Sequence, residues 1–141
     1  MASPSQSPAR DDDTADRTAA VPRTGFLRSF SFAGQGVWYV IRTQRNMRVH
    51  LAAAACAIAA GLALRISPAD WACVIITIAV VLAVETLNTV VEALTDLCTN
   101  EFHPLAKIAK DAAAGAVLIV SVAAVSVAIV VFLPRFFALA R

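Results

Sequence analysis

The segment ETLNTVVEALTDLCTNEFHPLAKIAKD, residues 85–111, begins inside one strongly apolar stretch of the chain and ends at the start of another. On a helix, where each residue turns about 100°, four of its polar side chains fall within one stripe about 80° wide. They belong to Glu85, Asn88, Glu92 and Asp96. A charged residue near the centre of a membrane helix costs roughly 2.5–3.5 kcal/mol on insertion scales, so such residues usually face protein or water. The stripe therefore indicates a functional site inside a membrane helix.

The composition of the whole chain indicates an integral membrane protein. Of its 141 residues 59% are hydrophobic, whereas a soluble domain has about 45–50% apolar residues. The excess is gathered in blocks, and three of them approach the roughly 20 residues that cross a bilayer. We expect spans at about 50–66, 71–95 and 112–133. The net charge of +2 gives no reason to expect a nucleic-acid partner.

Two segments precede these spans. Residues 1–22 are rich in Ser, Pro and Asp, cannot bury much apolar surface, and are predicted to be a disordered cytoplasmic tail. Residues 23–141 then form the membrane domain. Apolar residues recur on one helical face of residues 24–49, which predicts an amphipathic helix lying on the membrane; they are Phe26, Phe30, Val37 and Ile41. Gly34 and Gly36 would permit a bend in this helix.

Turn residues divide the apolar blocks. Pro68 ends the first span and Ser67 is expected to cap the second. Pro104 separates the second and third spans within a polar connection at residues 97–111, and Pro134 is expected to end the third. The predicted fold is therefore all-α, with one surface helix and three transmembrane helices.

Basic residues near the spans predict the orientation, because Lys and Arg are enriched on the cytoplasmic side. The N-terminal side and the polar connection carry most of them: Arg28, Arg42, Arg45, Arg48, Lys107 and Lys110. The turn between the first two spans carries only Arg65. The N-terminus and the polar connection are thus predicted to be cytoplasmic.

The residues alone leave more than one function open. Carboxylates can hold Mg²⁺ together with substrate phosphates, lysines neutralise phosphate charge, and a deeper carboxylate can act as a general base toward a hydroxyl. That combination suits phosphoryl transfer to a lipid alcohol, although the sequence has no Gly-rich phosphate-binding loop of the Walker type. Intramembrane carboxylates also serve proton or cation transport, and a structural role is a third alternative.

Three short motifs carry a resemblance to a known family. E-x-x-N-[ST]-x-x-E-x-x-x-D begins at Glu85, E-x-H begins at Glu101, and A-K-D ends at Asp111. This pattern resembles the signature of the prokaryotic diacylglycerol kinase family, and the wider similarity covers residues 24–134. QRNMRVH and HPLAKIAKD are more similar to the Gram-positive branch, which prefers undecaprenol, than to the branch that acts on diacylglycerol.

The resemblance implies an ATP- and Mg²⁺-dependent lipid kinase of the bacterial cytoplasmic membrane, with active sites shared between the subunits of a homotrimer. It implies that Glu85 is the catalytic base and contacts the lipid, that Asn88 orients Glu85, and that Glu92 binds the metal. The implied ATP-binding residues are Phe32, Glu101, Phe102, His103, Lys110 and Asp111. Asp96 matches a polar position whose role stays open.

One departure from the family pattern concerns the metal. The family usually has a glutamate just before the RN pair, and this chain has Gln44 there. Gln44 offers an oxygen without a charge, so we expect either weaker metal binding or a site in which Glu92 and the nucleotide phosphates suffice. A catalytically weak membrane scaffold is the corresponding alternative.

Overall fold

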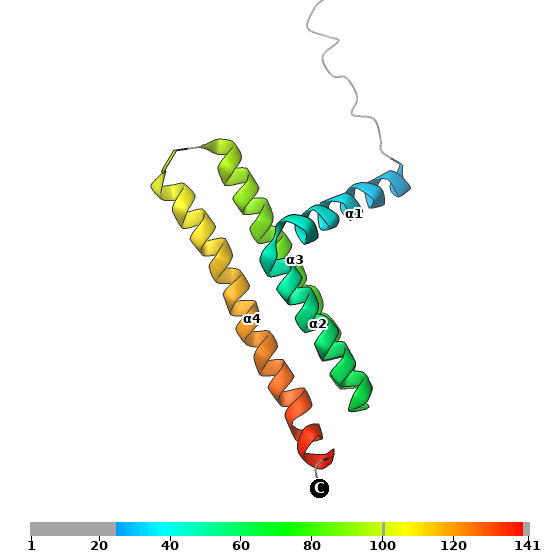
Figure 1. Ribbon diagram of the computed structural model, residues 1–141. Coiled ribbons are helices and arrows are strands. Elements are labelled where there is room, and N and C mark those ends of the chain that lie inside the picture. The colour runs from blue at the N-terminus through cyan, green and yellow to red at the C-terminus, as the bar shows by residue number, and fades with distance from the viewer. Residues whose placement is uncertain (1–24, 100, 140–141) are drawn as a thin grey trace, which may run out of the picture.

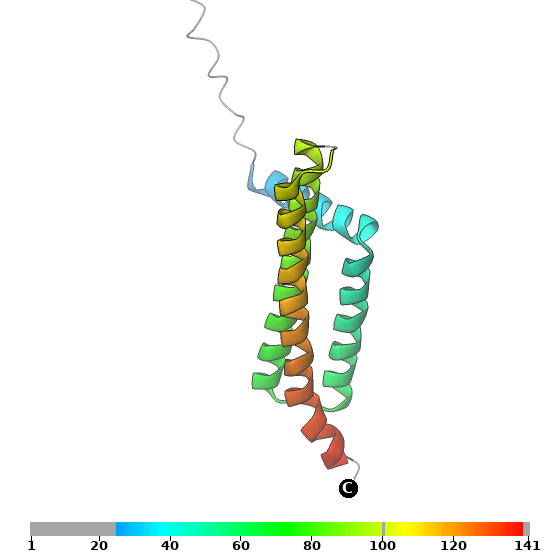
Figure 2. The same cartoon turned by 90° about the vertical axis from the view of Figure 1, so that its left-hand side faces the viewer.

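The computed structural model describes residues 25–99 and 101–139, which form four helices and no strand (Figure 1). These are α1 (Phe26–Thr43), α2 (Arg45–Ala63), α3 (Pro68–Cys98) and α4 (Pro104–Leu139). The predicted tail at residues 1–22 lies outside the described part. Helices α2, α3 and α4 run side by side, and α1 leaves the bundle where α2 begins (Figures 1 and 2). The all-α prediction is confirmed.

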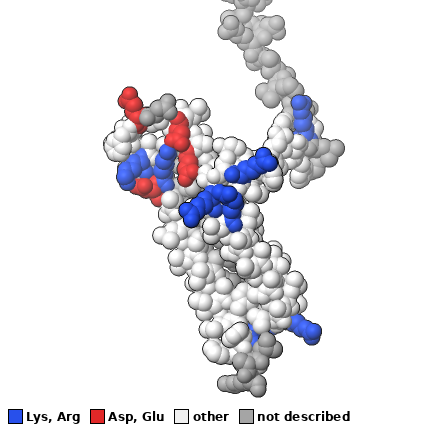
Figure 3. Space-filling view, in the orientation of Figure 1, with Lys and Arg blue, Asp and Glu red and all other residues white. Residues whose placement is uncertain are grey.

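Three of the helices meet the length and hydropathy requirements of a membrane span. They are α2, α3 and α4, and α4 is the most apolar. Most of the charged side chains gather at the end of the bundle near α1 and the α3–α4 connection, a long uncharged band lies below them, and a few basic side chains lie at the opposite end (Figure 3). This distribution is typical of a protein whose charged end lies at one membrane surface.

The surface helix is shorter than predicted, because the chain turns at Gln44. Gln44 adopts an extended conformation with φ −94° and ψ 120° and separates α1 from α2. Residues 45–49 therefore belong to the first spanning helix. Helix α1 continues through Gly34 and Gly36, so neither glycine provides the bend. Val40 of α1 is buried against the bundle, whereas Phe30 and Val37 stay exposed, as expected of a face that contacts lipid.

The turn between α2 and α3 is specified locally. Ser67 caps α3: its hydroxyl accepts from the Asp70 backbone N–H at 3.2 Å, and its own N–H donates to Asp70 Oδ2 at 3.1 Å. This is a capping box with Pro68 in the first turn, and it satisfies two otherwise unpaired N–H groups. The prediction for Ser67 is confirmed.

Two prolines of α4 behave differently from each other. Pro104 separates α3 from α4 as predicted, but it also begins α4, so most of the predicted polar connection is helical. Pro134 lies inside α4, which continues to Leu139, so this proline does not end the helix as we predicted. The helix bends near its C-terminal end (Figure 2), which is the usual effect of an internal proline. Beyond it, Arg135 Nη2 lies 2.6 Å from Asp70 Oδ2 and holds this last part of α4 against the start of α3.

Gly61 lets α2 pack closely against the side chains of Trp71 and Ile66. A Cβ at this position would lie 2.9 Å from Trp71 Cη2 and 3.1 Å from Ile66 Cδ1, whereas a Cβ at Gly115 would meet nothing within 4 Å. Overpacking costs about 1–3 kcal/mol, and Gly→Ala in an open helix gains up to about 1 kcal/mol. We expect Gly61→Ala to lower the midpoint of thermal unfolding in detergent micelles and Gly115→Ala to raise it. Equal shifts for the two variants would contradict this packing.

Candidate active site

Glu85 is the most deeply buried polar side chain of the described residues. It lies on α3, is 1% exposed, and its Oε2 atom has no hydrogen-bond partner among the described residues. Thr89, one turn along, is also buried and directs its hydroxyl to the Glu85 backbone carbonyl at 3.1 Å. A buried carboxylate oxygen without a partner is costly. It is therefore a candidate for contact with a substrate.

His50 faces Glu85 from the neighbouring helix. It lies in the second turn of α2, and its Nε2 atom is 4.0 Å from Glu85 Oε2. The His50 side chain is 18% exposed and that of Glu85 only 1%. His50 is therefore the more accessible member of the pair. His50 is not among the site residues that the sequence predicts. The available signal was an ionisable ring at the beginning of an apolar span, where such groups are rare.

Glu92 is the centre of a small network of amides. The Nε2 group of Gln44 donates to Glu92 Oε2 at 3.1 Å, and the Nδ2 group of Asn88 donates to Glu92 Oε1 at 3.0 Å. The turn at Gln44 brings its side chain to α3, so it does not cap α2. Asn88 is therefore hydrogen-bonded to Glu92, whereas the resemblance implies that it orients Glu85. Its Oδ1 atom is buried and has no partner within the described residues.

The predicted polar stripe divides into an inner and an outer part. Glu85 and Asn88 are buried and Glu92 is half-buried, but Asp96 is exposed. Asp96 Oδ1 lies 2.5 Å from Lys110 Nζ, which joins the end of α3 to the first turns of α4. Lys107 pairs with Asp111 on the surface of α4. Both lysines thus lie on a helix and not in a loop.

The other residues implied to bind ATP are spread over two regions. Glu101, Phe102 and His103 are exposed in the α3–α4 connection, and the His103 ring accepts from the Leu105 backbone N–H at 3.2 Å. Phe32 lies on α1, which leads away from that connection (Figure 1), and the Arg28 guanidinium lies 5.9 Å from its ring centroid. Within one chain the structure does not bring Phe32 together with the α3–α4 connection.

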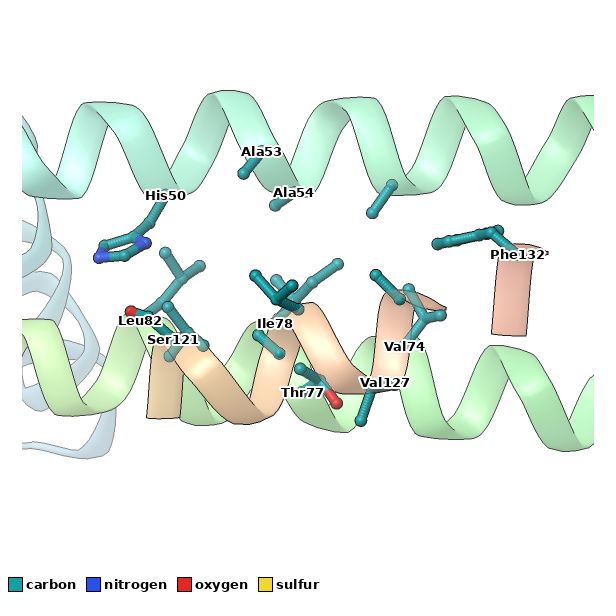
Figure 4. Close-up of a pocket in the computed structure, with 15 residues that line it drawn as sticks. His50, Ala53, Ala54, Val74, Thr77, Ile78, Leu82, Ser121, Val127 and Phe132 are labelled. Atoms are coloured by element: carbon teal, nitrogen blue, oxygen red, sulfur yellow. The ribbon is translucent and has the colours of Figure 1, made fainter. Parts of the chain in front are cut away.

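An apolar groove of about 340 Å³ lies between the three spanning helices (Figure 4). His50 is at one end and Phe132 at the other, and alanines of α2 form one wall (Figure 4). Thr77 and Ser121 are the other polar residues of the lining. Pockets that bind small molecules are usually apolar with few polar groups. The groove can hold a hydrocarbon chain whose polar end lies next to His50, whose Nε2 atom is 4.0 Å from Glu85 Oε2.

The metal-binding capacity of the site rests on few residues. Among the described residues, no three His, Cys, Asp or Glu side chains are grouped so that they could hold a metal ion. Glu92 and Gln44 offer one carboxylate and one amide oxygen. Mg²⁺ in nucleotide-dependent enzymes is usually bound by one or two carboxylates plus substrate phosphates. This donor set therefore fits the protein's share of a Mg²⁺–nucleotide site.

Comparison with known proteins identifies the family. The family model described as prokaryotic diacylglycerol kinase matches residues 31–132. Undecaprenol kinase of Bacillus subtilis is 41% identical over 110 residues, which cover 78% of this chain and 89% of that protein. Diacylglycerol kinase of Synechocystis is 42% identical over 109 residues, 77% of this chain and 62% of that protein. The chain therefore belongs to the prokaryotic diacylglycerol kinase family, a family of membrane lipid kinases.

Proposed function

We propose that this protein transfers the γ-phosphoryl group of ATP to the hydroxyl of a membrane lipid alcohol, and that undecaprenol is the main acceptor. The observation that carries the proposal is the buried Glu85, whose unpartnered oxygen lies near the polar end of an apolar groove. The relative that is matched over 89% of its length is an undecaprenol kinase, which favours undecaprenol. Diacylglycerol is the alternative acceptor, since the Synechocystis relative acts on it by name.

Glu85 is the proposed catalytic base. The lipid hydroxyl gives its proton to the Glu85 carboxylate while its oxygen forms a bond to the γ-phosphorus, and the bond from that phosphorus to the β-phosphate bridging oxygen breaks. The products are the lipid phosphate and ADP, and the proton stays on Glu85 until it is released. The low exposure of Glu85 excludes bulk water from this step, which favours transfer to the lipid over hydrolysis.

Glu92, with help from the Gln44 amide oxygen, is the proposed protein ligand of Mg²⁺. A bound Mg²⁺ would neutralise charge on the phosphate oxygens. Asn88 holds one carboxylate oxygen of Glu92 through its 3.0 Å hydrogen bond and is therefore a positioning residue. Gln44 holds the other oxygen at 3.1 Å. These two amides fix the orientation of the carboxylate.

The nucleotide is proposed to bind where α3 meets α4. Lys110 supplies positive charge to the phosphates, and its partner Asp96 keeps the ammonium group at this end of the bundle. The further contacts are assigned to Asp111 and to the E-x-H residues Glu101, Phe102 and His103. Phe32 is distant in the fold from this region, which supports a homotrimer in which neighbouring subunits complete each other's sites.

The proposed location is the bacterial cytoplasmic membrane, with the N-terminus and the active site on the cytoplasmic side. Helix α1, the first turn of α2 and the first two turns of α4 lie toward the same end of the bundle (Figure 1). They carry the basic residues Arg28, Arg42, Arg45, Arg48, Lys107 and Lys110. This agrees with the enrichment of basic residues on the cytoplasmic side. ATP is available on that side.

The acceptor is identified by offering undecaprenol and diacylglycerol separately to the purified protein in mixed micelles, with γ-labelled ATP and with or without Mg²⁺. We expect label in the lipid only with Mg²⁺, and a higher kcat/KM for undecaprenol. A higher kcat/KM for diacylglycerol would show that diacylglycerol, and not undecaprenol, is the main acceptor.

Gln44→Glu tests the effect of the missing charge at the metal site. The change places a second carboxylate beside Glu92, where an amide now donates across 3.1 Å. Without metal the two carboxylates repel each other, so we expect a lower midpoint of thermal unfolding. Added Mg²⁺ should raise that midpoint further in Gln44→Glu than in the wild type, because only a bound cation offsets the repulsion. Identical Mg²⁺ dependence in the two proteins would show that Gln44 does not limit metal binding.

A further inference from the structure

A polar atom of α2 and a polar atom of α3 face each other at a distance that one additional atom could bridge. His50 Nε2 and Glu85 Oε2 are 4.0 Å apart, which is too far for a hydrogen bond. One oxygen that lies about 2.8 Å from both atoms would see them at an angle of about 90°. A hydroxyl can make two such hydrogen bonds, since it donates one proton and accepts with its lone pairs.

The surroundings of this gap restrict what the third group can be. Glu85 is 1% exposed, and its Oε2 atom has no other partner among the described residues. His50 also forms one end of the apolar groove, in which alanines of α2 face residues of α3 and α4 (Figure 4). A group that enters between the two side chains from the groove therefore has a polar end of one or two atoms and an apolar remainder. A lipid alcohol has this form.

We propose that His50 binds the acceptor hydroxyl and holds it against Glu85. The hydroxyl donates its proton toward Glu85 Oε2 and accepts a hydrogen bond from the Nε2–H group of His50. One lone pair of the oxygen is then left to face the phosphoryl group. This inference rests on the proposed function, because it assigns a residue to the acceptor side of the same reaction.

Three substitutions at His50 test the role of the Nε2 donor. Glutamine can place an amide N–H near the position of the imidazole Nε2, asparagine reaches only as far as Nδ1, and leucine removes the donor. We expect His50→Leu and His50→Asn to lower kcat/KM for the lipid alcohol by about 10- to 100-fold, the effect of one lost hydrogen bond to a buried group. His50→Gln should recover most of the loss. The KM for ATP should stay unchanged in all three, since His50 does not face the proposed nucleotide site.

If His50→Leu does not fold, His50→Gln and His50→Asn still test the proposal. Both variants carry a neutral amide, and they differ in how far that amide reaches. Equal kcat/KM for these two variants, or a change confined to the KM for ATP, would overturn the role of His50. The wild-type protein is assayed in parallel. Transfer by the wild type together with unaltered kcat/KM in His50→Leu removes only the role of His50, whereas no transfer by the wild type to any lipid alcohol removes the proposed function itself.

Discussion

Glu85→Gln is expected to abolish lipid phosphorylation while the protein stays folded. The amide has nearly the shape of the carboxylate but cannot accept the hydroxyl proton. General base catalysis contributes typically 10²–10⁴-fold, so we expect kcat to fall by about that factor. The fold should persist, because Glu85 makes no side-chain hydrogen bond among the described residues and the change removes a buried charge. Phosphate transfer from labelled ATP measures the first effect, and thermal unfolding in micelles measures the second.

Glu85→Asp is the matched variant. It keeps the carboxylate but withdraws it by one methylene, so we expect activity between those of the wild type and Glu85→Gln. The KM for ATP should be the same in all three proteins, because Glu85 lies on the acceptor side of the proposed site. If Glu85→Gln turned over at the rate of the wild type, Glu85 would have no part in proton transfer.

The second large effect is expected at Glu92. Glu92→Gln removes the only carboxylate of the proposed metal site. Its amide oxygen can accept from one of the two amides that now bond Glu92, and its NH2 group can donate to the oxygen of the other once that amide turns over, so the local fold should survive. We expect the affinity for ATP in the presence of Mg²⁺ to fall by about 10- to 100-fold or more. Loss of a residue that only hydrogen-bonds to a metal ligand already lowers metal affinity by that factor. Equilibrium binding of ATP with and without Mg²⁺ measures it directly.

Binding of ATP without Mg²⁺ is the internal control for this variant. Glu92→Gln and the wild type should then have similar affinities, because Lys110 and the α3–α4 connection are unchanged. A variant whose affinity rises with Mg²⁺ as steeply as that of the wild type would show that another residue binds the metal.

Local chemistry explains which parts of the fold the sequence predicted. Ser67 and Pro68 specify a helix start through their own hydrogen bonds and fixed φ, so the beginning of α3 could be anticipated within a few residues. The turn at Gln44 has no such signal, since neither Gly nor Pro is present there. Pro134 carries a strong breaking signal, but the contact of Arg135 with Asp70 keeps the last turns of α4 in place. Tertiary contacts of this kind are not visible in a local sequence window.

In the candidate active site, too, the contacts between distant parts of the chain could not be predicted from the sequence. Helical spacing placed Glu85, Asn88 and Glu92 on one inward face, and the structure agrees. Spacing alone could not show that Asp96, one turn further, is exposed and pairs with Lys110 of α4. His50 approaches Glu85 across 35 residues of sequence, and Gln44, in the turn between α1 and α2, bonds to Glu92 of α3 across 48 residues. Such pairs depend on how the helices pack, which periodicity does not specify.

The central claim is that this chain phosphorylates a membrane lipid alcohol. The most direct test reconstitutes the purified protein in liposomes that contain undecaprenol, adds γ-labelled ATP and Mg²⁺, and measures label in the extracted lipid together with proton flux across the membrane. We expect labelled lipid phosphate in proportion to the ADP formed, and no proton flux in the absence of ATP. Unlabelled lipid together with proton flux that needs no ATP would contradict the central claim and assign the buried carboxylate to transport.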